Sequence, residues 1–500
     1  MTETRPPVLF VPWGTYALEQ QVAVGEYLRE HTGLQSHFLF LSGEDRRSVE
    51  YLRVKNFPYV AMREEVLSTG AKRGGTPEGV RSTQQPGKFK RVIRRFPGGK
   101  GLLELLSIGY QPLITALQTA STSKRLQAEK RWARRTLRSL RPYCAVVSQE
   151  RWIAFLPILK AMREEGIPVM LLLAADSSPD GGAALRKDGN FLSAGLSPAR
   201  RHRDDGPSAG RALINKLVAW WMPGQVYASR WGRMLYTAPA TLVALKLCGM
   251  LPRSLWYQGT TFVNHIIISG KDEMALYEQA NVDPRKLLRF GVPEMDTLYS
   301  KWQMRPQLRN ELALHYGFDA HKPFIVFAPP PLWEHELQSE EVHWQSLRAI
   351  LDALKPIYNQ VLVSLHPKMA IEHYRWMEND YSARICHERL KEVLSAADVF
   401  VCSYSSTLRW AVALGIPAIN VDLWDLRYTI FRGLQNYTTV TNIAGLGSAL
   451  ASASLQGVTK TPLNGDIICD GKAKERLINL IRSFADASAT TSPGREMAAT

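Results

Sequence analysis

The chain has 500 residues and a net charge of +16, with 45% hydrophobic and 22% charged residues. This length exceeds what one hydrophobic core usually supports, so two domains are expected. No apolar run reaches the ~18–20 residues of a membrane span, and residues 1–7 lack the apolar core of a signal peptide. The five cysteines are scattered without zinc-ligand spacing, which favours a cytoplasmic, reducing compartment.

The positive charge is concentrated in one region. Between Lys72 and Arg141 there are 17 Lys and Arg residues against three acidic residues. Such a region attracts anionic partners. Nucleic acid is not expected, because aromatic residues for base stacking are sparse there. Two interpretations stay open: a solvated basic surface without a specific partner, or contact with the anionic inner leaflet of a membrane or a polyanionic acceptor.

The N-terminal half alternates short apolar runs with helical stretches. Strands are expected at 8–12, 36–41, 59–62, 144–148 and 169–174, and helices at 16–30, 102–140 and 152–165. This alternation predicts a parallel, Rossmann-like sheet. The first turn contains Gly14 and Thr15 but is not GxGxxG, so it does not indicate a dinucleotide cofactor. Gly14 would let a phosphate or the acceptor approach the backbone closely.

Two segments interrupt this half. Residues 70–141 form a basic insertion that begins as a loop and continues as a helix. Residues 212–257 carry four tryptophans and several cations among leucines. The second segment fits broken helices lying in a membrane interface, and it equally fits an apolar helical pair packed between domains.

The C-terminal half contains three apolar runs, at 361–365, 398–402 and 417–421, with a helix over 407–414 between the last two. These runs predict buried parallel strands. Ligands of such sheets collect at the carboxyl ends of the strands. The residues there are the candidate donor-phosphate site: Pro329, His366, Pro367, Ser405, Ser406, Thr407 and Asp422. We expect Ser406 to cap the helix, whose free N–H groups favour a phosphate.

The predicted fold class is therefore α/β, with two Rossmann-like domains facing across a cleft. Residues 1–258 would form an acceptor domain and residues 259–485 a nucleotide-donor domain. Residues 486–500, rich in Ala, Ser and Thr, are expected to be a disordered tail.

Several short motifs in the C-terminal half occur in an order typical of one group of enzymes. They are Gly291-Val292-Pro293-Glu294-Met295-Asp296, Phe327-Ala328-Pro329-Pro330, Leu365-His366-Pro367, Ser405-Ser406 and the acidic loop from Asp422 to Tyr428. Over about residues 265–432 the chain resembles the GT-B-fold transferases that build bacterial surface polymers. It looks most similar to CDP-glycerol glycerophosphotransferases, to capsule Kdo- and sialic-acid-type transferases, and to the related UDP-N-acetylglucosamine 2-epimerases.

The resemblance implies a cell-envelope transferase that moves a sugar or polyol unit from a nucleotide-activated donor to a surface polysaccharide or lipid-linked acceptor. His366 and the serine pair would hold the donor phosphates, and Asp176 or Glu150 would be the catalytic base. No Asp-x-Asp motif follows a predicted strand, so we expect metal-independent transfer without a cofactor. The stretch after Ser406 lacks the carboxylate pair that retaining transferases of this kind present to the donor, so the resemblance implies inverting transfer. The enzyme would be cytoplasmic, with possible peripheral contact at the inner membrane face.

Two other functions are considered. One is a nucleotide-sugar epimerase, although Leu408, Arg409 and Trp410 stand where epimerases carry a glycine pair and then glutamates. The other is a non-catalytic scaffold of the same fold, which would have no affinity for nucleotides.

Overall fold

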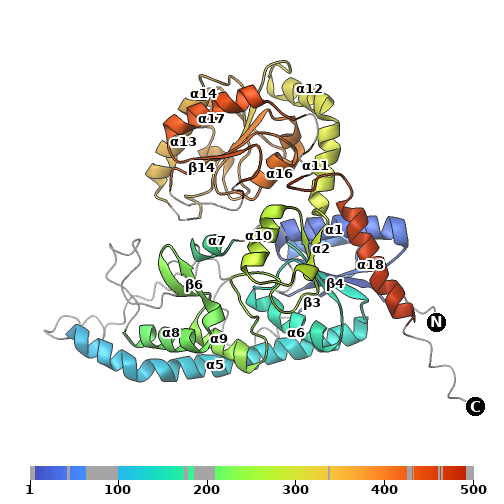
Figure 1. Ribbon diagram of the computed structural model, residues 1–500, viewed down its shortest axis with the longest axis vertical. Helices are drawn as coiled ribbons and strands as arrows, with labels where there is room; N and C mark the ends of the chain where they lie inside the picture. Colours follow the sequence, from blue (N-terminus) through green and yellow to red (C-terminus); the bar gives the residue numbers. More distant parts are fainter. Residues whose placement is uncertain are drawn as a thin grey trace, which may run out of the picture. The chain divides into compact units, whose positions relative to one another are not determined.

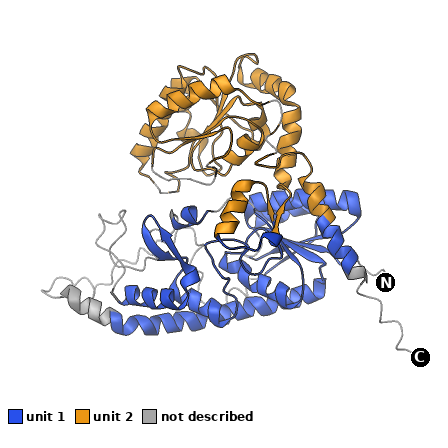
Figure 2. Cartoon of the chain, in the orientation of Figure 1, with its two compact units in different colours: residues 1–266, 280–286, 480–500 blue, residues 267–279, 287–479 orange. Residues whose placement is uncertain are grey.

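A computed structural model describes most of the chain. The described residues are 6–41, 45–62, 99–173, 178–184, 209–335, 338–424, 431, 433–459, 462 and 465–490, with the side chains of 99–107, 184, 209 and 488–490 left aside. Two compact units divide the chain (Figure 2). Unit 1 comprises residues 1–266, 280–286 and 480–500, and unit 2 comprises residues 267–279 and 287–479.

The first sheet has seven strands in the order β3-β2-β1-β4-β5-β8-β9. They are β1 (Val8–Val11), β2 (Ser36–Phe40), β3 (Tyr59–Ala61), β4 (Cys144–Val147), β5 (Val169–Leu172), β8 (His265–Ile268) and β9 (Leu287–Arg289). β1 pairs in parallel with both β2 and β4, so the strand order reverses between β1 and β4. Every residue of β1, β4 and β5 is buried, because helices cover both faces of such a sheet.

The helices of unit 1 include one much longer than the rest (Figure 1). They are α1 (Gly14–Thr32), α2 (Arg46–Val54), α5 (Gly99–Leu140), α6 (Leu156–Glu164), α7 (Pro179–Ala184), α8 (Ala209–Trp221) and α9 (Pro239–Leu247), with 3-10 turns at Ile153–Phe155 and Pro223–Gln225. Helix α5 packs against α6, α8 and α9. It matches the helix predicted at 102–140.

The tryptophan-rich segment differs from both expectations, since it contains a hairpin as well as helices. β6 (Val226–Ser229) and β7 (Gly232–Leu235) pair in antiparallel register between α8 and α9. Gly232 takes a φ of 115° in the turn, where a residue with a side chain would be strained, and the Ser229 hydroxyl donates to its carbonyl at 2.8 Å. The tryptophans of this segment differ in their exposure to solvent. Trp256 is buried in unit 1, whereas Trp220 and Trp221 are exposed.

The sheet of unit 2 is parallel throughout, in the order β12-β11-β10-β13-β14-β15. Its strands are β10 (Ile325–Ala328), β11 (Val361–Val363), β12 (Arg384–Ile385), β13 (Val399–Cys402), β14 (Ala418–Val421) and β15 (Tyr437–Val440). The helices are α10 (Lys271–Gln279), α11 (Pro293–Gln303), α12 (Arg305–Tyr316), α13 (Glu340–Leu354), α14 (Trp376–Tyr381), α15 (Leu390–Val393), α16 (Leu408–Ala413) and α17 (Ile443–Gln456). Short 3-10 turns lie at Ile371–His373 and Leu394–Ala396 in unit 2 and at Pro284–Lys286 in unit 1, and the C-terminal helix is α18 (Ala473–Thr490).

Unit 2 has a separate apolar core on each face of its sheet. Along β10, Val326 belongs to one cluster with residues of α11, α12 and α16. Its neighbours Ile325 and Phe327 belong to the other, with residues of α13 and α17. This two-residue alternation places helices on both faces of a parallel sheet. The predicted α/β fold class with two Rossmann-like sheets is confirmed.

Candidate functional site

The carboxyl edge of the unit 2 sheet gathers the predicted donor-site residues. The strand order reverses between β10 and β13, and in open α/β sheets ligands bind at such a switch point. Pro329 follows β10, His366 follows the adjacent β11, and Ser405 follows β13. β11 and β13 flank β10, so their axes are about 10 Å apart, which is two strand spacings.

The imidazole of His366 is held in a defined orientation at this edge. Its Nδ1 accepts a hydrogen bond from the Lys368 N–H at 3.2 Å, and its carbonyl accepts one from the Met369 N–H at 2.8 Å. Desolvation, followed by the positive charges of His335 and Lys368, lowers the pKa of His366. A neutral ring whose Nδ1 is an acceptor carries its proton on Nε2. His366 can therefore donate a hydrogen bond from Nε2 to a ligand.

A second histidine, which the sequence analysis did not select, lies against the first. The ring centroids of His335 and His366 are 5.6 Å apart in an edge-to-face arrangement. His335 belongs to the segment that follows Pro329 at the end of β10. The only sequence signal for it was its place in a polar stretch after a predicted strand.

The segment that carries His335 is anchored by a buried polar network. The Tyr374 hydroxyl donates to Glu334 Oε1 at 2.6 Å and lies 3.0 Å from Nε2 of the fully buried His343. Because Tyr374 donates its own proton to Glu334, its oxygen accepts from His343. Desolvation lowers the pKa of His343, so the ring supplies this bond in its neutral form. The network fixes the position of the residue before His335.

The loop after β13 presents hydroxyl groups in a constrained conformation. Ser405 Oγ accepts from the Thr407 N–H at 3.2 Å and lies 2.7 Å from Thr407 Oγ1. Tyr404 has a φ of 49°, a left-handed conformation that is uncommon for a residue with a side chain. Its N–H donates to Oδ1 of the buried Asn420 at 3.2 Å. Backbone strain of this kind is concentrated at functional sites.

The structure corrects the expected cap of the helix that follows. α16 begins at Leu408, and its N-cap is Thr407 rather than Ser406. Ser406 lies one residue earlier, half-buried in the turn, and its carbonyl accepts from the Arg409 N–H. The Ser405 hydroxyl bonds to the Thr407 N–H, and this turn delays the start of the helix. Because α16 has only six residues, its dipole is small. An anion at this loop would be bound mainly by the hydroxyl and N–H groups of the loop.

Arg409 does not point toward a ligand but forms a buried ion cluster within unit 2. Its guanidinium lies 2.7 Å from Asp272 Oδ2 and 2.9 Å from Glu273 Oε2, and all three side chains are buried. Glu273 also accepts backbone N–H groups at the start of α10. The cluster ties the first turn of α16 to α10.

The remaining predicted residues of unit 2 lie at the same edge. Pro329 is buried, Pro367 is exposed, and Asp422 is buried after β14, where its N–H donates to the Val440 carbonyl at 2.8 Å.

Asp296, at the end of the Gly291 motif, accepts the N–H groups of Ala473 and Lys474 at 2.8 Å each. It therefore caps the start of α18.

The first sheet has its own switch point, between β1 and β4, and the predicted glycine loop lies there. Gly14 opens α1 with a φ of 77°, and Gly14 and Thr15 are exposed. The N-cap, Trp13, makes no capping hydrogen bond through its side chain. Its ring packs on Trp152, which follows β4, with centroids 4.7 Å apart. The first turn of α1 thus keeps accessible backbone N–H groups.

Of the two predicted bases, only Glu150 falls within the described residues. It is fully buried, and its Oε1 accepts from the N–H groups of Thr261, at 3.1 Å, and Phe262. Burial raises the pKa of Glu150, against the effect of these hydrogen bonds. These contacts fix the loop before β8. Asp176 lies outside the described residues.

Two further observations concern the described part of the chain. None of its helices has the length and apolar character needed to cross a bilayer. Nor does it bring three or more His, Cys, Asp or Glu side chains together in a group suited to a metal ion. All five cysteines are buried, and none of them forms a disulfide.

These features define a doubly wound α/β protein whose second unit gathers imidazole, hydroxyl and backbone N–H groups at its switch point. No protein-family model matches the chain. It is 25% identical over 229 residues to the teichoic acid glycerol-phosphate primase of Bacillus subtilis (strain 168), a match covering 43% of this chain and 56% of the primase. The chain thus spans little more than half the length of this relative. The match confirms the resemblance to bacterial surface-polymer transferases.

Several solved structures are similar to the chain over nearly its whole length. The UDP-GlcNAc 2-epimerase of Methanocaldococcus jannaschii, in complex with UDP-GlcNAc and UDP, matches with a TM-score of 0.48 and 12% identity, covering 95% of this chain and 99% of the epimerase. The wall teichoic acid polymerase TagF, as a variant soaked with CDPG, matches with a TM-score of 0.44 and 11% identity, covering 97% and 90%. A putative UDP-N-acetylglucosamine 2-epimerase from Listeria monocytogenes gives a TM-score of 0.49 and 10% identity, covering 97% of each chain.

Proposed function

We propose that the protein is a transferase that moves a unit from a nucleotide-activated donor to an acceptor hydroxyl in cell-envelope polymer synthesis. The observation that carries this proposal is the joint placement of His366, His335 and the Ser405–Thr407 loop at the switch point of unit 2. Imidazole N–H, hydroxyl and loop N–H groups are the donors that recognise phosphate oxygens.

The sequence match to a glycerol-phosphate primase favours a polyol phosphate as the transferred unit over a sugar. The acceptor would be a surface polysaccharide or a lipid-linked precursor, and the protein would act in the cytoplasm. In polyol-phosphate transfer, the acceptor oxygen forms a bond to the distal phosphorus of the donor. The bond from that phosphorus to the bridging oxygen breaks, and a nucleoside monophosphate leaves. The acceptor's proton passes to a base.

The residues of unit 2 would act on the leaving group. Charge develops on the departing phosphate, and donors placed in advance stabilise it. His366 is suited to this role because it can donate from Nε2 while Lys368 holds Nδ1. Ser405, Ser406 and Thr407 would contact the remaining phosphate oxygens, and Asp422 would lie near the nucleotide. His335 would orient His366 or contact the same phosphate.

We place the base in unit 1, and transfer would be inverting and independent of a metal ion. Asp176 is the stronger candidate, because both amide contacts of Glu150 and its complete burial suit a structural carboxylate. Gly14 and Thr15 would lie at the acceptor side, where the uncapped first turn of α1 leaves N–H groups accessible.

The buried ion cluster weighs against the epimerase alternative. Arg409 stands in the stretch where epimerases carry glutamates, and it is fully engaged with Asp272 and Glu273. Incubation with UDP-N-acetylglucosamine alone separates the two functions. An epimerase would change the sugar without an acceptor, whereas the proposed transferase would leave it unchanged.

Ligand-dependent stabilisation tests the proposal directly. Thermal unfolding would be followed with CMP, CDP, UDP, GDP and ADP in turn, since a ligand that binds the folded state raises the apparent stability. We expect one nucleotide to stand out, and its effect to be lost in His366→Ala and reduced in Ser406→Ala. His321→Ala and Ser448→Ala are matched controls, because both residues are exposed in unit 2 away from this edge. A response to none of the nucleotides would support the non-catalytic scaffold and contradict the proposal.

A further inference from the structure

Helix α8 has an apolar stripe on its exposed side as well as on its buried side. Leu213, Leu217 and Trp220 recur at intervals of four and three residues, so they lie along one face of the helix. All three are exposed, and Trp220 reaches 84% exposure. The opposite side of α8, including Val218 and Ala219, is already buried in unit 1. The exposed stripe is therefore not needed for the core.

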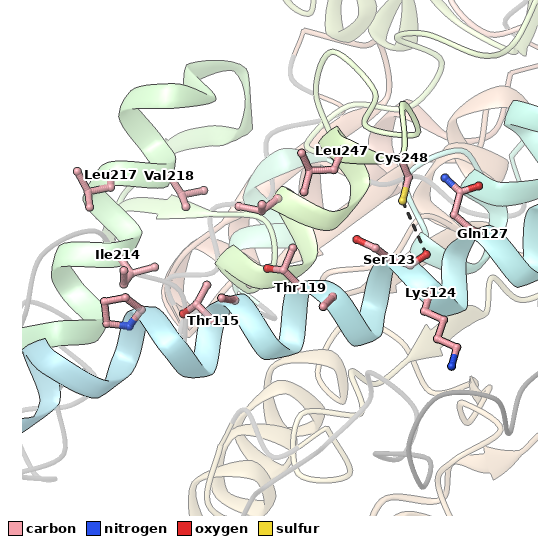
Figure 3. Close-up of a pocket in the computed structure, with 14 residues that line it drawn as sticks. Thr115, Thr119, Ser123, Lys124, Gln127, Ile214, Leu217, Val218, Leu247 and Cys248 are labelled. Carbon is pink, nitrogen blue, oxygen red and sulfur yellow. Dashed lines mark hydrogen bonds between the residues drawn. The ribbon is translucent and has the colours of Figure 1, made fainter.

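The stripe continues onto the neighbouring helices around a shallow groove of about 800 Å³. The groove is lined by residues of α5, α8 and α9, among them Thr115, Leu217 and Leu247 (Figure 3). On α5, the exposed Leu113 and Leu117 lie in line with groove-lining residues one and two turns further along the helix. Three helices of unit 1 thus present one apolar face. We call it the α5–α8–α9 face.

The helical stretches that form this face carry charges of one sign. The sequences of residues 108–128, 209–221 and 239–247 contain Lys and Arg but neither Asp nor Glu. Lys216 and Lys246 are exposed, and the Lys246 Nζ lies 5.4 Å from the ring centroid of Trp221. The next acidic residue of α5, Glu129, is buried and lies 3.7 Å from Arg125. Exposed tryptophan and leucine with flanking cations are the composition that binds at the interface of a bilayer.

We propose that the α5–α8–α9 face docks onto an anionic lipid bilayer. Leu217, Trp220 and Leu247 would enter the boundary between head groups and acyl chains, and Lys216 and Lys246 would contact the phosphates of anionic lipids. The chain would lie on the bilayer rather than span it, in keeping with the absence of a spanning helix among the described residues. This inference is independent of the catalytic proposal, because all the residues it uses belong to unit 1 and none to the candidate donor site.

The charges favour a bilayer over a second copy of the chain as the occupant of this face. In a twofold-symmetric dimer the same surface meets itself. The face of one copy, with Lys216 and Lys246, would then meet the same cationic face of the other copy. Anionic head groups supply the opposite charge to each of these cations.

Co-sedimentation with lipid vesicles tests the inference on the full-length chain. Vesicles of phosphatidylcholine alone are compared with vesicles that also contain about 30 mol% phosphatidylglycerol, an anionic lipid. We expect binding to the anionic vesicles, weakened by added salt. The double variant Leu217→Gln/Trp220→Gln should lower the partition coefficient about tenfold or more, the loss expected for withdrawing large apolar side chains. Lys216→Glu/Lys246→Glu should lower it by a similar factor.

The control for the apolar variant is Leu314→Gln/Leu455→Gln, which replaces two leucines that are 88% and 90% exposed on α12 and α17. The control for the charge variant is Arg285→Glu/Lys322→Glu, which changes the net charge equally at exposed positions elsewhere. Both controls should bind vesicles like the unmodified chain. Circular dichroism checks that every variant is folded. If Leu217→Gln/Trp220→Gln does not fold, the single variant Trp220→Gln is tested in its place.

Three outcomes would overturn the inference: equal binding to neutral and anionic vesicles, unchanged binding by both face variants, or a dimer in light scattering that Leu217→Gln/Trp220→Gln abolishes without any vesicle binding. The last outcome would assign the face to a second copy. His366→Ala should leave vesicle binding unchanged, and Leu217→Gln/Trp220→Gln should leave nucleotide-induced stabilisation unchanged. A failure of this inference can thus be distinguished from a failure of the proposed function.

Discussion

Arg409 Nη2 lies 2.7 Å from Asp272 Oδ2, and both side chains are almost completely buried. The two residues are far apart in the sequence, yet this contact joins α16 to α10 within unit 2. Glu273 completes the cluster on the other nitrogen of the guanidinium. One cation therefore offsets two buried carboxylates, one of which is also held by backbone N–H groups.

Removing this cation should be strongly destabilising. Arg409→Met leaves two carboxylates buried without their partner, and breaking a buried ion pair in this way costs about 3–5 kcal/mol. Chemical denaturation measures the loss. Lys322→Met, which removes an exposed ion pair with Asp319, should change the free energy of unfolding by less than about 1 kcal/mol. Adding Asp272→Asn to Arg409→Met should recover part of the loss; no recovery would mean that the carboxylates are not the source of the cost.

The two histidines at the candidate site should be coupled in their titration. Desolvation and then the charges of His335 and Lys368 lower the pKa of His366. His335→Gln should therefore raise the pKa of His366, which an NMR titration of the imidazole proton signals would show. His321→Gln, at an exposed position before β10, should leave it unchanged. A separate variant, His366→Gln, should weaken binding of the nucleotide selected by thermal unfolding about tenfold or more, as expected for a lost hydrogen bond to a charged group.

The two candidate bases should separate on conservative substitution. An amide oxygen at position 150 can still accept the N–H groups of Thr261 and Phe262, so Glu150→Gln should remain folded and active. Asp176→Asn should lower the transfer rate by about 10²–10⁴, the usual contribution of a general base. Both rates are measured by the release of nucleoside monophosphate from a donor activated with the nucleotide that the thermal-unfolding series selects. A large loss of rate in a folded Glu150→Gln variant would instead assign the base to Glu150.

Glu294 should make the protein less stable as the pH rises. Burial raises its pKa from 4.5 to about 8, so the folded state keeps a proton that the unfolded chain releases above pH 4.5. The unfolded state binds fewer protons in this window, and the free energy of unfolding falls with pH by up to about 1.4 kcal/mol per unit. The stabilisation is complete below pH 4.5 and is lost as the pH rises toward about 8.

Glu294→Gln removes this titration. The variant should be more stable than the unmodified chain at pH 8, and its free energy of unfolding should vary less between pH 5 and pH 8, a window set by the two pKa values. Urea denaturation across the series measures both. Glu341→Gln on the exposed surface of α13 is the control and should reproduce the original pH profile. A Glu294→Gln profile as steep as the original would exclude Glu294 as the source.

The order of strands and helices could be predicted from the sequence because it follows from local patterns. Fully buried strands such as Val8–Val11 and Val399–Cys402 are continuous apolar runs, and parallel sheets place ligands at the carboxyl ends of such runs. His366 and Ser405 could therefore be assigned to one edge from the sequence alone. The hairpin within the tryptophan-rich segment could not, because its register depends on packing around the buried Trp256.

The chain's own pattern thus determined the class of fold, the edge that carries the candidate site and most of the polar residues on it. Only the tertiary structure decided that Arg409 is neutralised by Asp272 and Glu273, that His335 lies against His366, and that Glu150 is a buried anchor. These depend on contacts between residues distant in the sequence, and whether a charged side chain meets a partner, a ligand or solvent is set by what packs beside it. A short sequence motif identifies a polar residue but does not predict which side chains will pack around it.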